Sequence, residues 1–373
     1  MRYALKRRWR SCAGYGLVVA AAIGACNYES FNLPPAPPKT YTIQQLGLLP
    51  GGTQSQANGG SATAIVGWGI VSGSSHHAAA FAGGQGIALK EPTGTTASEA
   101  RGVNDAGVVV GFAQISGVRR AYWWPAASAA ATPVALPNLG GTYSFARSVN
   151  QNGLILGSAQ TDTGDTVIVI WTPDGMGGYT VARLDTAGGQ DYDAAAISNR
   201  GVAAGNGTDN GFIWNASEGF EDVDVPAGGA DTAGVDVNGM NNYGIIAGAY
   251  TDAVTGNDRS FIFTSTAGSI PLGPPPSPYT GVAAGGVTDS GMVAAVASGV
   301  DAGGNAISAV VVGSILDTAN VWTVLPLLPG GTRASVSDNG VTACGVLVGY
   351  ATKTTAATPR YAVAWVPQGC TIP

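Results

Sequence analysis

Two stretches of the chain, ARGVNDAGVVVG at residues 100–111 and ARSVNQNGLILG at residues 146–157, match position for position at a spacing of 46 residues. Looser copies of the same unit bring the total to seven and occupy almost all of residues 40–373. A repeat of that length with several short strand-like runs indicates a propeller or a solenoid before any other fold. Each copy is therefore expected to form one supersecondary unit that packs against its neighbours.

Three landmarks recur in a fixed order within the copies. The first is a polar turn that is closed by glycine and followed by an apolar run, which predicts a hairpin, because Asn and Asp satisfy turn backbone groups and glycine adopts a positive φ. The second is an aromatic or aliphatic strand, and the third is a strand that ends in glycines. Two strands flank the hairpin and two follow it, giving four per unit. Further copies of the turn are predicted at residues 197–202, 240–245, 287–292 and 336–341.

The two ends of the repeat region predict a closed ring. The last copy stops at Val366-Pro367, whereas the region opens with an unmatched third landmark at residues 41–52, which resembles residues 322–331. That opening run can supply the missing fourth strand of the last copy, as a circular array requires. We therefore predict an all-β, seven-bladed β-propeller of four-stranded antiparallel blades, closed by the N-terminal strand. The alternatives are a pair of sandwiches or a β-solenoid, although a solenoid would need polar caps, and none is visible.

Composition supports a single all-β domain over residues 40–373. Glycine is abundant, with 57 residues, and charged residues make up only 11% of the chain. No long amphipathic stretch with helical spacing follows residue 40. A closed ring of blades is one domain despite its length, so we expect no internal boundary.

The first 25 residues predict a lipoprotein signal peptide. A basic start is followed by an apolar segment at residues 14–25, which is too short to span a bilayer permanently. Residues 23–26 resemble the site in bacterial lipoprotein precursors at which the cysteine, here Cys26, is acylated with groups such as palmitate. The alternative is an ordinary cleaved secretion signal with an incidental cysteine. Asn27, in place of Asp, favours delivery to the outer membrane by the same resemblance.

Residues 26–39 are expected to form the lipidated cysteine and a stiff, Pro-rich tether that holds the domain off the membrane. With Cys12 in the signal and Cys26 lipidated, only Cys344 and Cys370 remain in the folded domain. Cys344 lies in residues 341–344, which we interpret as an insertion that other copies lack. An oxidising envelope favours a Cys344–Cys370 disulfide, worth about 3 kcal/mol through loop closure. The alternative, a catalytic or metal-binding thiol pair, lacks a nearby histidine.

The charge balance argues against nucleic acid as a partner. Five of the 17 basic residues precede Cys26, which leaves 12 against 23 acidic residues in the mature chain, a balance of about −11. The acidic residues are scattered over predicted loops and mainly favour solubility. We expect a monomer that meets the membrane through its N-terminal lipid.

Few residues are suited to catalysis or to metal binding. His76 and His77 are the only histidines, and they are expected to be strand residues near a blade surface, because no further histidine exists to complete a metal site or a relay. Asp turns such as residues 104–107 and 288–291 lack the alternating acidic ligands of a calcium cage, and turn formation accounts for them. We predict no metal, no cofactor and no catalytic residue. Arg101 and Arg147 precede equivalent hairpins on the strand that is usually innermost in a propeller, so they are candidates to line the channel and bind an anion.

Residues 48–53, 98–111 and 139–150 resemble the extracellular HAF-repeat proteins of bacteria. Those repeats join a Ser-x-Ala-x-x-Ile-Asn-x-x-Gly-x-Val-Val-Gly core to a His-Ala-Phe-x-Trp strand. The similarity covers residues 40–367, but RRAYW at residues 119–123 and DRSF at residues 258–261 replace His-Ala-Phe, and only His77 keeps the histidine. The resemblance implies an exported repeat protein without a defined activity.

Two classes of function follow from these observations. The first is an envelope lipoprotein that acts as a binding or scaffold module for a protein or a glycan through one face of the ring. The second is a propeller enzyme, a lyase or a glycoside hydrolase, with its site at the central channel. Glycoside hydrolysis needs two carboxylates at a defined separation, and the sequence shows no inward-facing acidic pair. We therefore favour binding.

Overall fold

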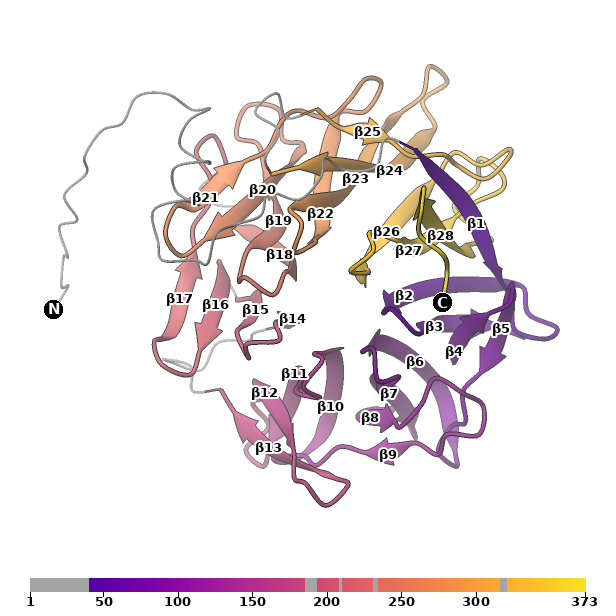
Figure 1. Cartoon of the computed structure of the whole chain (residues 1–373), viewed down its shortest axis with the longest axis vertical. Coiled ribbons are helices and arrows are strands. Elements are labelled where there is room, and N and C mark those ends of the chain that lie inside the picture. The colour runs from indigo at the N-terminus through magenta and orange to yellow at the C-terminus, as the bar shows by residue number, and fades with distance from the viewer. Residues whose placement is uncertain (1–39, 185–192, 208–209, 231–233, 316–320) are drawn as a thin grey trace, which may run out of the picture.

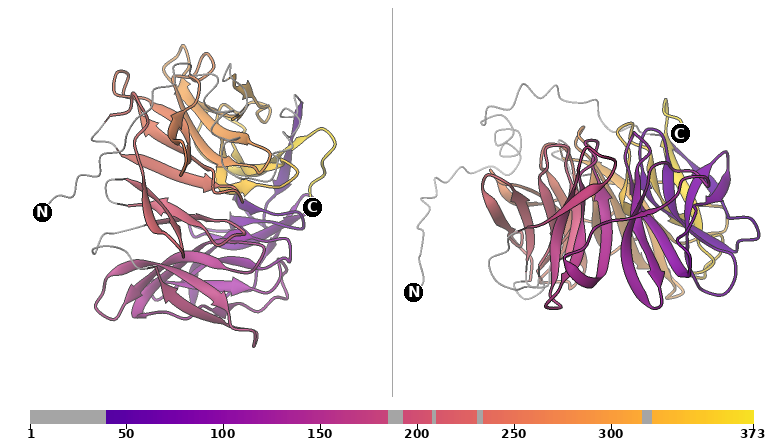
Figure 2. Two further views of the ribbon diagram at one scale, coloured as in Figure 1. Left: turned by 60° about the vertical axis from the view of Figure 1, so that its left-hand side comes forward. Right: turned by 90° about the horizontal axis from the view of Figure 1, so that it is seen from below.

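The structure is a computed structural model that describes residues 40–184, 193–207, 210–230, 234–315 and 321–373. The predicted signal peptide, Cys26 and the tether lie outside these described residues. Within them the chain forms 28 β-strands and no helix. The strands are grouped into seven blades around a central axis (Figure 1). Viewed edge-on, the blades stand side by side, with their strands running between the two faces of the ring (Figure 2).

Each blade contains four strands, which follow one another from the axis to the rim. Blade 1 contains β2 (Gln54–Gly60), β3 (Ile65–Ile70), β4 (His77–Ala82) and β5 (Gln85–Ala88); blade 2, β6 (Thr95–Val103), β7 (Val109–Ile115), β8 (Val118–Trp124) and β9 (Val134–Ala135); blade 3, β10 (Gly140–Val149), β11 (Ile155–Thr161), β12 (Thr166–Pro173) and β13 (Tyr179–Arg183); blade 4, β14 (Asp193–Ile197), β15 (Ala203–Asn206), β16 (Gly211–Asn215) and β17 (Gly219–Val223); blade 5, β18 (Val235–Met240), β19 (Ile246–Thr251), β20 (Asp258–Thr264) and β21 (Gly268–Pro271); blade 6, β22 (Gly281–Val287), β23 (Met292–Val300), β24 (Ala306–Ser314) and β25 (Thr323–Val324); blade 7, β26 (Ala334–Val341), β27 (Leu347–Ala351), β28 (Tyr361–Pro367) and β1 (Tyr41–Gly47).

The hydrogen-bonded sheets confirm the predicted propeller and exclude an open solenoid. Blades 2 to 6 are separate four-stranded sheets, and blades 7 and 1 join into one eight-stranded sheet through a single parallel pair, Gly59 with Asn339. The described core is divided into seven clusters of buried side chains, one at each interface between neighbouring blades. Stability therefore comes from blade-to-blade packing around the whole ring.

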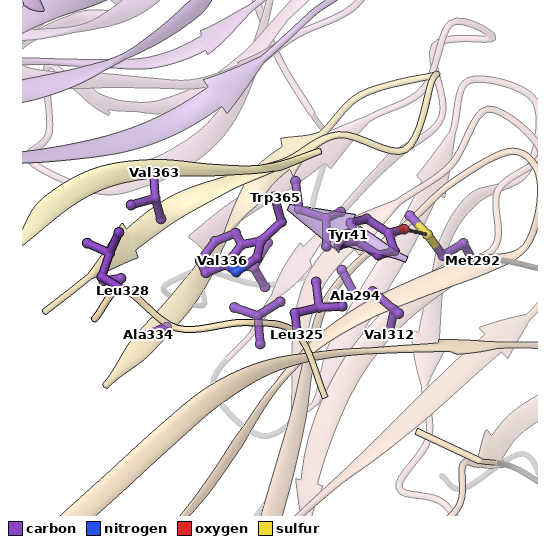
Figure 3. Close-up of a cluster of buried hydrophobic side chains, with 13 residues drawn as sticks. Tyr41, Met292, Ala294, Val312, Leu325, Leu328, Ala334, Val336, Val363 and Trp365 are labelled. Atoms are coloured by element: carbon purple, nitrogen blue, oxygen red, sulfur yellow. Dashed lines mark hydrogen bonds between the residues drawn. The ribbon is translucent and has the colours of Figure 1, made fainter. Parts of the chain in front are cut away.

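The N-terminal strand closes the ring, as the sequence predicts. β1 pairs antiparallel with β28, with Tyr41 opposite Pro367 and Ile43 opposite Trp365. Tyr41 is only 7% exposed, and its hydroxyl donates a hydrogen bond to Met292 Sδ of blade 6 at 3.0 Å (Figure 3). The strand therefore completes blade 7 and also contributes to the core between blades 6 and 7.

In blades 2 and 3 the last glycine of the repeat core lies opposite a bulge on the innermost strand. In blades 2 and 3 the pairing register of the first two strands shifts by one residue, between Ala100 and Gly102 in blade 2. The second strand then approaches the first so closely that a Cβ on Gly111 would lie 2.0 Å from the Glu99 carbonyl oxygen, and one on Gly157 would lie 2.1 Å from the corresponding oxygen in blade 3. Glycine allows this close approach in blades 2 and 3, whereas blade 6, which has the same bulge, accommodates Ala295 at the equivalent position.

The polar turns do more than reverse the chain, so their interpretation as turns alone was incomplete. The residue in the second turn position donates its backbone N–H to the side chain in the same position of the next blade. Asp105 N bonds to Gln151 Oε1 at 2.9 Å, and Gln151 N bonds to Asn199 Oδ1 at 2.8 Å. Further links of this kind join Ala62 to Asp105, Asn199 to Asn242, and Asn242 to Asp289. We call the face that carries these turns the hairpin face, and the opposite one the loop face.

The structure corrects the predicted turn of the last copy. Residues 336–341 are not a hairpin turn but part of β26, where a long bulge separates the pairs of Val336 and Val341 with β27. The actual turn is Thr342 to Gly345, with Gly345 N bonded to the Thr342 carbonyl and Val346 N to its hydroxyl. Residues 341–344 are therefore not an insertion. The extra residues lie in the bulge, where Ser337 to Gly340 occupy the place that Arg101 and Gly102 have in blade 2.

Cys344 and Cys370 form a disulfide with a Cα–Cα distance of 6.2 Å, in agreement with the predicted pairing. Because Cys344 lies in the hairpin turn of blade 7, the bond ties that turn to the C-terminal tail. The tail follows β28, the strand that pairs with β1. The covalent link therefore lies in the blade where the ring closes.

Candidate functional site

The residue three positions before each hairpin turn is the extra residue of the inner-strand bulge. In blades 2 and 3 this residue is Arg101 and Arg147. Both arginines line a cavity of about 170 Å³ inside the ring, together with Gln56, Asn58 and the β26 bulge. The structure thus brings the two predicted channel residues together, and whether they bind an anion remains a prediction.

Each of these arginines already faces a carboxylate. Arg147 Nη2 is hydrogen-bonded to Asp338 Oδ2, and Arg101 Nη2 lies 2.8 Å from Glu99 Oε2. Burial raises the pKa of Asp338 above its ordinary value, and the Arg147 guanidinium opposes that rise. Burial likewise lowers the pKa of Arg101, and Glu99 opposes that change. An incoming anion would have to compete with these carboxylates for the guanidinium groups.

Residues 337–340 extend across the channel like a plug, and we call them the β26 plug. Ser337 Oγ bonds to the Ala57 carbonyl of blade 1 at 2.6 Å, whereas Asn339 Nδ2 bonds to the Arg147 carbonyl of blade 3 at 3.1 Å. Asp338 and Asn339 line both the 170 Å³ cavity and a second one of about 160 Å³ toward the hairpin face. The plug therefore lies between two small cavities and narrows the path through the ring.

His76 belongs to a polar cluster beside the channel. Its imidazole stacks on Trp68 with ring centroids 3.7 Å apart, and its Nδ1 lies 2.7 Å from Glu99 Oε1. Glu99 therefore joins His76 to Arg101. The histidine lies just before β4 and is about one-third exposed, which agrees with the predicted position near a blade surface.

His77 lies in a second chain of polar contacts that does not match a nucleophilic site. Its Nδ1 is 3.0 Å from Glu91 Oε1, and the same oxygen accepts a hydrogen bond from Ser98 Oγ. Ser98 thus donates to the carboxylate and not to the imidazole, and it is fully buried. A serine activated by histidine needs the opposite arrangement.

Within the described ranges, no group of three or more His, Cys, Asp or Glu side chains is placed to hold a metal ion. The Asp turns considered for calcium are occupied by contacts between blades. Asp289 accepts hydrogen bonds from the backbone and the side-chain amide of Asn242, both at 2.8 Å. Their oxygens are therefore committed to holding neighbouring blades together.

A larger hollow opens on the loop face between blades 3 and 4, and we call it the Tyr143 hollow. Its volume is about 650 Å³, and all its lining side chains are polar except for the aromatic ring of a tyrosine. Burial raises the pKa of the Tyr143 phenol, Arg119 opposes that rise, and Asp193 adds to it. The lining residues are Tyr143, Ser158, Gln160, Thr166, Asp193, Asn206 and Gly207.

Most of the residues at these sites were not predicted from the sequence. Asn58 and Asn339 occupy the same bulge position as the two arginines and could have been found by counting three residues back from each turn. The Tyr143 hollow has no such signal, because its lining comes from five strands of two blades. Residues this far apart in the chain meet only once the ring has been assembled.

No helix among the described residues is long and apolar enough to cross a membrane. No family model and no curated protein matches the sequence. Among solved structures, the chain is similar to a puromycin hydrolase, with 14% identity and a TM-score of 0.54 over 89% of this chain and 55% of that one. It spans only about half the length of that protein. It is also similar to YCF48 bound to a D1 peptide, with 10% identity and a TM-score of 0.50 over 91% of this chain and all of that one. Similarities at these identities establish the β-propeller fold and nothing more specific.

Proposed function

We propose that this chain is a binding or scaffold module whose ligand, a protein or a glycan, contacts the loop face of the propeller. The observation that carries the proposal is the Tyr143 hollow, an open site lined by polar side chains that do not serve a hydrophobic core. Its volume of about 650 Å³ falls within the range of about 300–1,000 Å³ that is usual for small-ligand sites. We further propose that the module works as a monomer.

We also propose that the module is a lipoprotein of the bacterial envelope that is anchored to the outer membrane through Cys26 and is a member of the HAF-repeat proteins. The support is the sequence of residues 23–26 and the repeat cores at residues 98–111 and 139–150. The test is Cys26→Ser, which should move the protein from the detergent phase to the soluble envelope fraction. Continued partitioning of the variant into detergent would contradict the anchor.

A propeller enzyme is the weaker candidate. Glu99 is held by His76 and Arg101, and Asp338 by Arg147, so these two carboxylates are engaged in ion pairs. Of the two similar structures one is named a hydrolase, but that name belongs to a chain of which this one covers only 55%. No observation on this chain favours turnover over binding.

The experiment that tests binding is a combined array of glycans and peptides, probed with the lipid-free domain of residues 40–373. We expect reproducible binding to a restricted chemical class, without loss of the ligand over time. A folded domain that binds nothing on the array would contradict the binding function. Product formation that depends on His76 or His77 would replace it with an enzymatic one.

A further inference from the structure

The Tyr143 hollow has a lining suited to one class of ligand. Hydroxyl groups come from Tyr143, Ser158 and Thr166, and side-chain amides come from Gln160 and Asn206. The lining includes no aliphatic side chain that a bound peptide could use as an apolar pocket. Pockets for drug-like molecules are mostly lined by apolar side chains with a few polar groups, so a lining of hydroxyls and amides favours a ligand that carries many hydrogen-bonding groups.

Several polar groups of the hollow are held in place by the fold itself. The Asn206 amide spans to blade 5, where its Oδ1 accepts from Val237 N at 2.6 Å and its Nδ2 donates to the Val237 carbonyl at 3.0 Å. Gln160 Nε2 donates to the Gly164 carbonyl at 2.9 Å. The Asn206 amide retains one further donor and one further acceptor position, whereas the Gln160 amide retains only a donor, because its Oε1 already accepts from the backbone and the hydroxyl of Thr142. A ligand would therefore meet preorganised groups, which lowers the entropic cost of binding.

Other groups of the hollow are unengaged. Among the described residues, neither the Tyr143 hydroxyl nor the Asp193 carboxylate has a hydrogen-bond partner. Asp193 is exposed, and the side chain of Tyr143 is only partly buried. Asp193 is also the only charged side chain in the lining. Its carboxylate would accept hydrogen bonds from hydroxyl groups and would repel an acidic ligand.

We infer that the Tyr143 hollow binds a neutral saccharide, with the Tyr143 ring packed against one face of a sugar and Asp193 accepting hydrogen bonds from its hydroxyls. A sugar ring offers an apolar C–H face and many hydroxyls, each of which both donates and accepts. That pattern matches an aromatic ring surrounded by hydroxyls, amides and one carboxylate. The inference rests on the proposed binding function and specifies the ligand class of the same face.

The test uses isothermal titration of the lipid-free domain with three probe sets: neutral glucose and N-acetylglucosamine oligomers, galacturonate oligomers, and peptides. We expect binding to a neutral oligomer only. Tyr143→Ala should weaken that binding at least about tenfold, which corresponds to about 1.4 kcal/mol. Tyr143→Phe, which keeps the ring, should weaken it only about threefold, and Asp193→Asn about tenfold.

Tyr243→Ala is the matched control, because Tyr243 lies in a turn of the hairpin face and is 39% exposed. Circular dichroism of every variant establishes whether it is folded. If Tyr143→Ala does not fold, Tyr143→Phe and Asp193→Asn carry the test. Binding to neutral saccharides that Tyr143→Ala and Asp193→Asn leave unchanged would overturn the inference and leave the binding function standing. Selective binding to uronates or peptides would do the same. Absence of binding to all three sets would contradict the function and the inference together.

Discussion

Replacing Tyr41 tests whether the N-terminal strand holds the ring closed. Tyr41 is 7% exposed and packs in the cluster that contains Trp365, Leu325 and Met292 (Figure 3). Truncating a buried aromatic side chain to alanine costs about 3–5 kcal/mol, from lost transfer free energy and from the cavity that remains. We expect Tyr41→Ala to lower the free energy of unfolding by that amount.

A second variant separates packing from hydrogen bonding at the same position. Tyr41→Phe keeps the ring and removes only the hydrogen bond to the Met292 sulfur, a weak acceptor, so it should cost less than about 1 kcal/mol. The measurement is urea denaturation followed by tryptophan fluorescence, with limited proteolysis to detect release of the strand. Tyr243→Ala on the surface is the control. If Tyr41→Ala costs no more than this control, β1 does not stabilise the ring and the closure argument fails.

Three further predictions follow from the structure. The double variant Cys344→Ser/Cys370→Ser should lose about 3 kcal/mol of stability, as should reduced wild type; equal stability in reductant would show that the bond does not constrain the unfolded chain. Gly157→Ala should lower the free energy of unfolding by about 1–3 kcal/mol, because the new Cβ would lie 2.1 Å from a backbone oxygen. Ala295→Gly, at the equivalent position of blade 6, should lower it by less than about 1 kcal/mol. If thermal melts show Ala295→Gly to be the more destabilised variant, the bulge geometry is contradicted. Burial raises the pKa of the Tyr41 hydroxyl in the folded protein to about 12, whereas in the unfolded chain it titrates near the ordinary value of about 10. The contribution of this group to the free energy of unfolding is therefore fully present below pH 10 and is lost as the pH rises toward 12. Tyr41→Phe should therefore lose less stability than wild type over that window, and parallel pH curves for the two proteins would refute the assignment.

The architecture was predictable from sequence because its signals are local and repeated. A turn such as Asn104 to Gly107 sets a hairpin whatever the rest of the chain does, since asparagine and glycine satisfy the turn by themselves. Seven such units of about equal length can bury the apolar faces of their sheets in only a few arrangements. The unmatched run at residues 41–52 indicates the arrangement in which the array closes into a ring. Strand order and ring closure follow from those facts.

The last blade shows where local signals fail. Ser337 to Gly340 reads as a turn as clearly as the other copies do, but a second turn follows at Thr342 to Gly345, and only one of them can join β26 to β27. The choice depends on backbone carbonyls of blades 1 and 3, which accept hydrogen bonds from the side chains of Ser337 and Asn339 across the channel. Contacts between residues that lie 280 and 192 positions apart have no trace in a local pattern, and the Tyr143 hollow was missed for the same reason.

Blade 7 differs from the other blades in the contacts that join it to its neighbours, and this explains why the contacts that close the ring are found in this blade. Hydrogen bonds from turn to turn run from Ala62 through Asp105, Gln151, Asn199 and Asn242 to Asp289. The corresponding residue of blade 7 is Ala343, whose methyl group offers no acceptor, and Ala62 offers none to blade 7. The series of hydrogen bonds from turn to turn is therefore interrupted at both interfaces of blade 7, with blade 6 and with blade 1. Blade 7 instead has the paired strand β1 and the β26 plug, which tie it to distant parts of the chain, and the disulfide, which ties its hairpin turn to the C-terminal tail. A ring built from a linear chain must have one joint without covalent continuity, and here the unusual contacts are concentrated at that joint.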